Sequence, residues 1–323
     1  MSDREEKTGK NDNGKKNKGG KRNKIVAIEM IILVLLIMAA VAIFIQRDKS
    51  VKEAAKIHNQ KAKKTEQTPQ AAQKENEIEE ETEGTEEETG DRDASVPDRS
   101  NFAVQPGVSV GTTEQSDEKI VYLTLDDGPS DNTQAVLDIL DKYNAKATFF
   151  VTGEMPEYKD MIKAAYDKGH TIGMHTYSHD YAKVYASVDA YFQDLDQIGQ
   201  MVQEEIGYVP CFIRFPGGSS NTVSKKYTAG IMSTLVQEVQ NRGYQYYDWN
   251  GSSGDGSVRT TEELVAQATS FDSNKIILLC HDSHGKQTTV EALPQIIEHY
   301  QSLGYTFKAL DRDSFVAHHG VNN

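Results

Sequence analysis

The sequence contains very little cysteine: Cys211 and Cys280 are the only two among 323 residues. Two cysteines are too few for a disulfide framework, and isolated cysteines usually end up as buried free thiols. We therefore expect two buried, unpaired thiols rather than a disulfide bond. The chain has a formal net charge of -14, and its C-terminal two-thirds lacks a stripe of basic residues. Without such a stripe, nucleic acid is not an expected partner.

Long apolar runs are also scarce, and one stands out, at residues 25–45 (IVAIEMIILVLLIMAAVAIFI), with Glu29 as its single charge. At about 1.5 Å per residue this run spans roughly 30 Å, the thickness of one hydrocarbon core. It lacks the short apolar core and the small-residue cleavage site of a secretory signal peptide. The run predicts an uncleaved transmembrane signal anchor.

The orientation of this anchor depends on the basic residues beside it. Residues 1–24 are rich in lysine, and fewer basic residues follow the run closely. The positive-inside bias then favours a cytoplasmic basic tail at 1–24 and an extracytoplasmic head on a single-pass cell-membrane protein. The bias is modest, so a cytoplasmic head that acts on a soluble metabolite remains an alternative.

Residues 46–117 form no convincing core, and the stretch from Glu75 to Asp93 (ENEIEEETEGTEEETGDRD) has almost no apolar content. Such a composition cannot bury enough apolar surface to offset the entropy of ordering. We expect a disordered, largely acidic linker at 46–117 and a globular domain at 118–323.

From residue 119 onward, short apolar runs alternate with segments of helical periodicity. About seven such units predict a parallel sheet covered by helices. Several polar residues fall at the carboxyl ends of different predicted strands, as in the catalytic sites of (β/α) barrels, so a barrel is preferred over a doubly wound sheet. The predicted strands are 119–125, 147–153, 171–174, 211–215, 244–249, 275–281 and 305–310.

Two of these strand ends carry residues suited to a metal site. Asp126 and Asp127 follow a buried strand and precede a Gly-Pro turn, so that one carboxylate can bind a metal while its neighbour handles a proton. His175 and His179 are four residues apart and would lie on one face of a helical turn, where they can bind one ion together. Taken singly, each pattern is more often a plain turn or a pair of surface histidines.

Three further strand ends add polar groups. His281 could act as a general acid near neutral pH, and Arg214 could pair with Asp248 and orient a carboxylate. In isolation, a histidine at the core edge is an equally good reading of His281, and a structural ion pair is the better reading of Arg214 and Asp248. One aspartate and two histidines leave positions open for water and substrate, which suits Zn²⁺ or another divalent ion such as Co²⁺, Ni²⁺ or Mn²⁺. The predicted chemistry is amide hydrolysis.

These motifs resemble the polysaccharide deacetylase family, carbohydrate esterase family 4, with its NodB homology domain. The resemblance extends from about Ile120 to Leu310, and the motifs occur in the family's order. It implies a distorted (β/α) barrel and a metal-dependent hydrolase. The first motif, Thr-Leu-Asp-Asp-Gly-Pro, implies Asp126 as catalytic base and Asp127 as metal ligand; the second implies His175 and His179 as the other two ligands.

The remaining motifs match less completely. Arg214 begins the third and would orient the base, but Gly217 replaces the usual tyrosine while keeping the backbone N–H that serves the oxyanion. The fourth has lost its first aspartate. It retains Asp248, which would pair with Arg214, and Trp249, which would line the acetyl pocket. The fifth is Leu279-Cys280-His281, in which Leu279 would contact the acetyl methyl group and His281 would be the catalytic acid.

The resemblance and the predicted anchor together favour a peptidoglycan N-acetylglucosamine deacetylase, because a tethered head suits a wall polymer. Its expected partners are an acetylated cell-wall glycan and, through one helix, the membrane. Deacetylation of an exopolysaccharide, a chitin-like oligomer or an O-acetyl ester remains an alternative. A catalytically silent glycan-binding protein is a further one, although an intact set of catalytic residues speaks against it.

Overall fold

The computed structural model describes residues 99, 101–114 and 116–323. The predicted basic tail (1–24), the predicted anchor (25–45) and most of the predicted linker (46–117) lie outside the described residues. No helix in the described part of the chain is both long and apolar enough to cross a bilayer.

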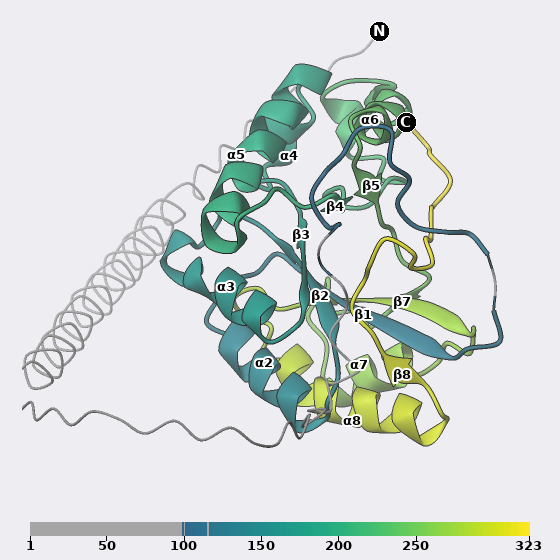
Figure 1. Cartoon of the computed structure of the whole chain (residues 1–323). Helices are drawn as coiled ribbons and strands as arrows, with labels where there is room; N and C mark the ends of the chain where they lie inside the picture. Colours follow the sequence, from purple (N-terminus) through teal and green to yellow (C-terminus); the bar gives the residue numbers. More distant parts are fainter. Residues whose placement is uncertain (1–98, 100, 115) are drawn as a thin grey trace, which may run out of the picture. The chain divides into compact units, whose positions relative to one another are not determined.

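An all-parallel sheet forms the centre of the domain, in the order β5-β4-β3-β2-β1-β7-β6, with β8 also paired to β1 (Figure 1). The two longest strands, β1 and β7, are neighbours and are almost wholly buried, as their continuous apolar sequences predict. The strands are β1 (Ile120–Asp126), β2 (Ala147–Val151), β3 (Thr171–Met174), β4 (Phe212–Ile213), β5 (Gln245–Tyr246), β6 (Gly251–Ser252), β7 (Lys275–His281) and β8 (Thr306–Phe307).

Helices cover one face of this sheet and pack on it through their apolar sides (Figure 1). Their ends follow sequence signals: the hydroxyl group of Ser187 caps α5, and Gly207 ends it in a left-handed conformation. A capping box of Thr260 and Glu263, a pattern that can be read from the sequence, is present at α7. The helices are α2 (Thr133–Lys142), η1 (Pro156–Tyr158), α3 (Asp160–Asp167), α4 (Tyr181–Val184), α5 (Val188–Ile206), η2 (Ser224–Lys226), α6 (Ile231–Asn241), α7 (Thr261–Ala268) and α8 (Gln287–Ser302).

The sheet is a curled half-barrel, which is consistent with the distorted (β/α) barrel that the resemblance implies. Its edge strands β5 and β6 are not paired with each other in the described domain. Residues 247–250 link them directly, and the C-terminal segment lies alongside this link: the Asp248 N–H donates to the carbonyl oxygen of Ala317 (3.0 Å). The imidazole of His318 stacks on Tyr246 of β5. Residues of the loop and of the C-terminal segment thus lie between the two edge strands.

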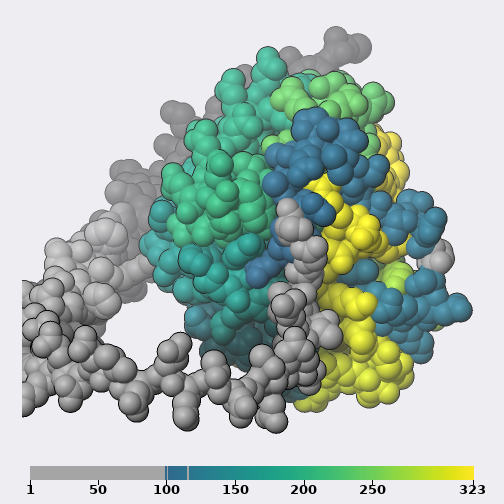
Figure 2. All heavy atoms as spheres, viewed as in Figure 1, coloured from purple at the N-terminus to yellow at the C-terminus, as the bar shows by residue number. Residues whose placement is uncertain are grey.

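The inner face of the sheet is covered by two extended segments instead of helices. They are residues 101–114, the N-terminal segment of the described domain, and residues 308–323, the C-terminal segment. Phe102 and Val110 from one segment and Val316 from the other join a second apolar cluster against this face. Figure 2 shows the N-terminal segment (blue) and the C-terminal segment (yellow) adjoining on the visible surface. The side chain of Arg312 donates hydrogen bonds to backbone carbonyls of the N-terminal segment, including that of Ala103 (2.7 Å).

The folded domain therefore begins earlier than the predicted boundary at residue 118. Phe102 is 1% exposed and Val110 is 8% exposed. The segment from 101 to 114 shows no regular helical or strand period, so the sequence carries no local signal that it is folded. Its burial depends on an inner sheet face that is formed by residues far along the chain.

Both cysteines are free and buried, as predicted. Burial raises the pKa of the Cys211 thiol to about 11 and that of the Cys280 thiol well above its ordinary value. Neither thiol is therefore ionised near neutral pH, which makes both unreactive.

Candidate active site

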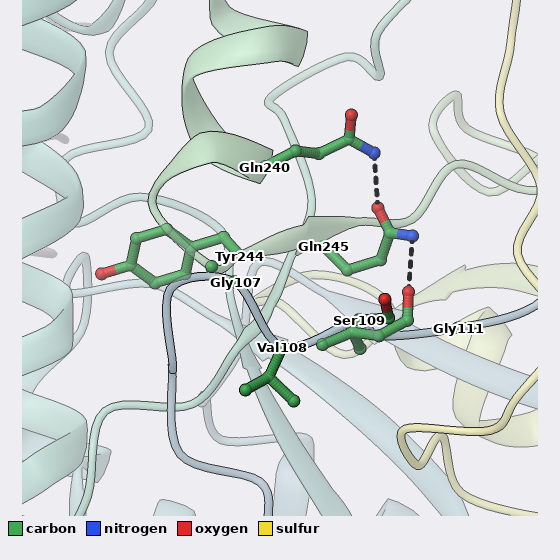
Figure 3. Close-up of a pocket in the computed structure, with 9 residues that line it drawn as sticks. Gly107, Val108, Ser109, Gly111, Gln240, Tyr244 and Gln245 are labelled. Atoms are coloured by element: carbon green, nitrogen blue, oxygen red, sulfur yellow. Dashed lines mark hydrogen bonds between the residues drawn. The ribbon is translucent and has the colours of Figure 1, made fainter.

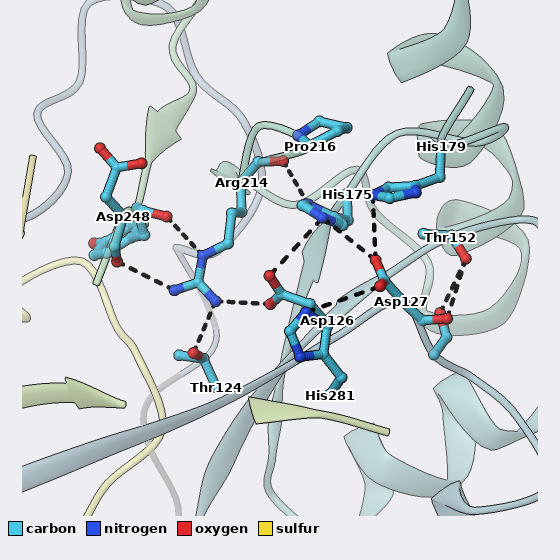
Figure 4. A network of polar contacts seen from close by, with 12 residues as sticks. Thr124, Asp126, Asp127, Thr152, His175, His179, Arg214, Pro216, Asp248 and His281 are labelled. Carbon is cyan, nitrogen blue, oxygen red and sulfur yellow. Dashed lines mark hydrogen bonds and ion pairs between the residues drawn. The ribbon is translucent and has the colours of Figure 1, made fainter. Parts of the chain in front are cut away.

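The polar residues singled out in the sequence converge at the carboxyl ends of the strands (Figure 4). Asp126 ends β1, and Asp127 follows it. His175 follows β3, Arg214 follows β4, and His281 ends β7. Because parallel strands present their carboxyl ends at one edge, residues separated by more than 150 positions become neighbours.

Asp127, His175 and His179 form a cluster that fits a divalent metal ion. The Oδ1 atom of Asp127 lies 3.4 Å from the Nε2 atoms of both histidines, and all three ligand atoms lie within 4.8 Å of one another. Four ligands at about 2.0–2.1 Å from zinc in a tetrahedral arrangement are about 3.3 Å apart. This Oδ1 atom is buried and has no hydrogen-bond partner in the described part of the chain.

The tautomer of His175 also suits metal binding. Its Nδ1 atom lies 2.8 Å from the carbonyl oxygen of Arg214, an acceptor, so Nδ1 carries the proton and the Nε2 lone pair faces Asp127. Burial lowers the pKa of His175. Burial opposes the charge of Asp127, but the surrounding histidines outweigh it and lower the pKa of this carboxyl group.

The segment that carries the two histidines is not the helical turn that was predicted. Thr176 and His179 adopt positive φ angles of 67° and 47°, and the segment is irregular. Asp194 of α5 holds it in place by accepting hydrogen bonds from the backbone N–H groups of Tyr177 (2.6 Å) and Ser178 (2.9 Å). The imidazole rings still meet, 5.0 Å apart, because of this buried carboxylate.

Arg214 is fully buried and holds Asp126. Its Nη1 atom donates to Oδ1 of Asp126 (2.7 Å) and to the hydroxyl group of Thr124 (2.8 Å). Its Nε atom donates to the carbonyl oxygen of Tyr247 (2.7 Å), and the guanidinium group lies over the ring of Phe150. The guanidinium group is thus fixed on several sides and orients the carboxylate beside the metal cluster.

The predicted side-chain pair of Arg214 and Asp248 is wrong. Arg214 contacts only the backbone carbonyl oxygen of Asp248 (3.2 Å). The carboxylate turns away and accepts hydrogen bonds from the backbone N–H groups of Ser219 (2.8 Å) and His319 (2.8 Å). Asp248, which lies in the link between β5 and β6, therefore connects the loop after β4 to the C-terminal segment.

The carboxylate that does pair with a catalytic candidate is Asp255, which the sequence analysis missed. Its Oδ1 atom lies 2.8 Å from Nδ1 of His281, and its Oδ2 atom accepts from the His281 N–H (2.8 Å). Burial opposes the charged imidazole, but the hydrogen bond and charge of Asp255, with the charges of Asp126 and Asp127, raise the pKa of His281 to about 9. Asp255 follows the two-residue strand β6, which is too short for a periodic signal.

The residues predicted to contact substrate lie around this cluster. Leu279 is 8% exposed and precedes His281 by two positions on β7, so both side chains face the same side of the sheet. The ring of Trp249 lies 5.7 Å from the guanidinium carbon of Arg214 and edge-on to the ring of His319.

Gly217 adopts a φ of +75°, which disfavours any side chain. A Cβ atom there would lie 2.6 Å from the hydroxyl oxygen of Tyr181. The ring of Tyr181 also lies edge-on to the imidazole of His179. Tyr181 of α4 thus occupies the space where the usual tyrosine of the third motif would begin.

A hollow in the described domain lies away from these residues. It has a volume of about 390 Å³ and lies between residues 107–111 and the junction of α6 with β5 (Figure 3). Gln240 and Gln245 are hydrogen bonded across it, and Gln245 also donates to the carbonyl oxygen of Val110. No carboxylate, imidazole or amine lines this hollow, so it offers no groups for acid, base or metal chemistry.

Comparison with known proteins agrees with the fold. The family model for polysaccharide deacetylases matches residues 113–236. A peptidoglycan-N-acetylglucosamine deacetylase of Bacillus cereus is 30% identical over 223 residues, 65% of this chain and 78% of that protein. A chitin deacetylase of Arthroderma benhamiae is 36% identical over 182 residues, 54% of this chain and 46% of that protein.

Among solved structures, the catalytic domain of a peptidoglycan N-acetylglucosamine deacetylase from Eubacterium rectale is 45% identical. The alignment covers 70% of this chain and 99% of that domain, with a TM-score of 0.62. The chain belongs to the polysaccharide deacetylase family. It is a polysaccharide deacetylase of the carbohydrate esterase 4 type.

Proposed function

We propose that the protein removes N-linked acetyl groups from a glycan by metal-dependent hydrolysis. The observation that carries this proposal is that two candidate proton-transfer groups lie beside the metal cluster, each close to one of its ligands. Asp126 Oδ2 lies 3.8 Å from Nε2 of His175, and His281 Nε2 lies 3.9 Å from Oδ2 of Asp127. A base and an acid beside a Lewis-acid site are what amide hydrolysis requires.

Each residue then has a defined task. Asp126, held by Arg214, accepts the proton of the attacking water. His281, kept protonated by Asp255, gives its proton to the leaving amine. The backbone N–H of Gly217 donates a hydrogen bond to the developing oxyanion. A divalent ion held by Asp127 and the two histidines, with zinc the preferred candidate, supplies polarisation of the acetyl carbonyl group.

The preferred substrate is N-acetylglucosamine in peptidoglycan. Two relatives that cover most of the domain are named for this substrate, and a tether beside the membrane would keep a head near a wall polymer. A chitin-like glycan is the second candidate, because a chitin deacetylase is also a relative. An O-acetyl ester is the third candidate substrate. Its hydrolysis would use the same metal and base, but its leaving group is an alcohol, so no amine has to be protonated.

For the location, we propose a single-pass protein with residues 25–45 as its anchor and the catalytic head outside the cytoplasm. The apolar run and the lysine-rich residues before it support this. Protease treatment of intact cells tests it: the head should be cleaved from the surface. A head that stays protected until the cells are lysed would contradict this orientation.

The activity is tested by acetate release from the compact unit of residues 88–323. Peptidoglycan, N-acetylglucosamine oligomers and an O-acetylated xylan serve as substrates, each with Zn²⁺ and with a chelator. Release from the first two that is lost with chelator and regained with Zn²⁺ supports the proposal. A folded, zinc-loaded protein that releases acetate only from the xylan would reassign it as an esterase.

A further inference from the structure

Asp282 immediately follows His281, yet its side chain faces away from the metal cluster. It is fully buried, and its Oδ2 atom accepts a hydrogen bond from the hydroxyl group of Thr133 (2.6 Å). Its Oδ1 atom is also inaccessible to solvent and has no hydrogen-bond partner among the described residues. Burial raises the pKa of Asp282 to about 7, and the charges of Asp127 and Asp126 add to this effect. A carboxyl group so placed is costly to bury and needs an explanation.

The surrounding hydrogen bonds connect the end of β7 to the turn after β1. The backbone carbonyl oxygen of Asp282 accepts from the hydroxyl group of Ser130, and that of Ser283 accepts from the side chain of Asn132 (2.8 Å). The Asp282 N–H donates to the carbonyl oxygen of Asp126 (3.3 Å). The segment that leads from the catalytic strand into α2 is therefore fixed to β7.

Gly128 lies in direct contact with this carboxyl group. A Cβ atom added to Gly128 would lie 2.3 Å from Oδ1 and 2.5 Å from Oδ2 of Asp282. The φ angle of Gly128 is not in the left-handed region, so the space taken by Asp282, rather than the backbone conformation, requires glycine here. The preceding residue, Asp127, has a φ of 67°, which is uncommon for a residue with a side chain and persists only where the surroundings hold it.

We propose that Asp282 is a positioning residue that fixes the turn from Asp127 to Thr133 and thereby aims the Asp127 carboxylate at the two histidines. This inference rests on the metal site of the proposed function. Residues that orient metal ligands from behind change metal affinity by about 10–100-fold when they are altered. A residue that only stabilised the fold would lower the melting temperature without a comparable loss of metal affinity.

The test measures zinc binding to the metal-free full chain by competition with a chromophoric chelator, with the melting temperature recorded in parallel. Asp282→Ala is expected to raise the Kd for zinc at least tenfold. Asp282→Asn keeps the shape and an oxygen that can accept from Thr133, so its Kd should stay within about threefold of wild type. Unchanged zinc affinity in a folded Asp282→Ala protein would overturn the proposal.

A matched pair of threonine variants decides the question if Asp282→Ala does not fold. Thr133→Val removes the hydrogen bond to Asp282 and the one that the Thr133 hydroxyl group accepts from the Ser130 N–H within the same turn. Thr171→Val, at the start of β3, removes a buried hydrogen bond to the carbonyl oxygen of Leu310. Both should lower the melting temperature similarly, but only Thr133→Val should weaken zinc binding, by about threefold or more. Equal zinc affinities in the two variants would contradict a positioning role.

A double variant tests the contact itself. Gly128→Ala should weaken zinc binding because its methyl group meets Asp282. In Gly128→Ala combined with Asp282→Ala this clash is gone, so the double variant should bind zinc no more weakly than Asp282→Ala alone. Fully additive losses would refute the contact. Wild-type protein that binds no zinc would instead overturn the proposed metal site, and wild-type protein that binds zinc but releases no acetate would overturn the proposed reaction alone.

Discussion

The active site contains two ion pairs, and the charge of the catalytic candidate and that of its supporting partner are reversed between them. On one side a carboxylate, Asp126, is held by the buried guanidinium group of Arg214. On the other side an imidazole, His281, is held by the buried carboxylate of Asp255. Both supporting groups are almost fully buried, at 0% and 2% exposure.

The difference between the two partners assigns the two proton-transfer roles. A cation beside Asp126 favours an orientation in which the carboxylate accepts a proton from water, and an anion beside His281 keeps the ring charged and ready to donate one. The protein thus places a base and an acid within one small site without either neutralising the other. Variants that remove one member of either pair test this comparison.

The largest effect is expected for Asp126→Asn, which removes the base itself. Deacetylation should fall about 10³-fold, within the range for loss of a general base. Zinc content should be unchanged, because Asp126 is not a ligand in the proposed cluster. Steady-state kinetics with metal analysis checks both points, and a variant that retains a tenth of the activity would exclude Asp126 as the base.

Arg214→Met removes the partner on the base side. It leaves a carboxylate unpaired in a buried site, which typically destabilises a protein by about 3–5 kcal/mol. Thermal or urea unfolding measures this, and activity should fall about 10²-fold where the variant is folded. Lys163→Met is the control: it breaks an exposed pair with Asp167 and should cost less than about 1 kcal/mol. Equal losses in the two variants would contradict a special role for the buried pair.

Asp255→Asn removes the partner on the acid side. His281 has a pKa of about 9 in the folded protein, so the acid form is lost, and activity falls, only as the pH rises through about 9. In the variant this alkaline limit should move towards the ordinary histidine value of about 6.5. Activity at pH 8 should fall about tenfold or more, and a pH–rate profile shows the shift. An unchanged alkaline limit in the Asp255→Asn variant would show that His281 is not the catalytic acid.

The same pair contributes to stability in a defined pH window. The folded-state pKa lies above the unfolded value of about 6.5, so the contribution is complete below about pH 6.5 and is lost as the pH rises through 9. Wild type should therefore lose stability relative to Asp255→Asn over this interval. The exposed variant Asp272→Asn is the control and should follow wild type.

The smallest effect is expected for Tyr181→Ala, which alters neither pair. The ring fills the space beside Gly217 and His179, so its loss should raise KM for N-acetylglucosamine oligomers about fivefold, in line with about 1 kcal/mol for an aromatic contact. The value of kcat should change less. Tyr143→Ala, at the far end of α2, should match wild type, and equal KM values in both variants would exclude Tyr181 as part of the substrate wall.

The sequence predicted most strands and helices because their signals are local. β3 and β7 match their predicted ranges, and the capping box at Thr260 is present. The two-residue strand β6 and the short helix α4 were missed, since such short elements show no periodicity. The helical turn predicted for His175 to His179 was wrong, because the carboxylate of Asp194 imposes a different conformation.

For the site, the sequence named the residues at strand ends, but not all of their partners. The predicted pairing of Asp248 with Arg214 failed, and Asp255 was not considered. Both outcomes depend on where the chain runs between the edge strands β5 and β6. A path of this kind is set by packing against the C-terminal segment, about 70 residues away in the chain.

The sequence by itself determined the alternation of strands and helices, the family resemblance and the strand-end residues, because each depends on neighbours within one turn or one strand. Only the tertiary structure decided that the half-barrel is open, that the terminal segments cover its inner face, and that Asp255 and Asp282 lie behind the site. These features depend on contacts between residues that are distant along the chain. Their hydrogen bonds and buried charges exist only once the strands have been brought to a common edge.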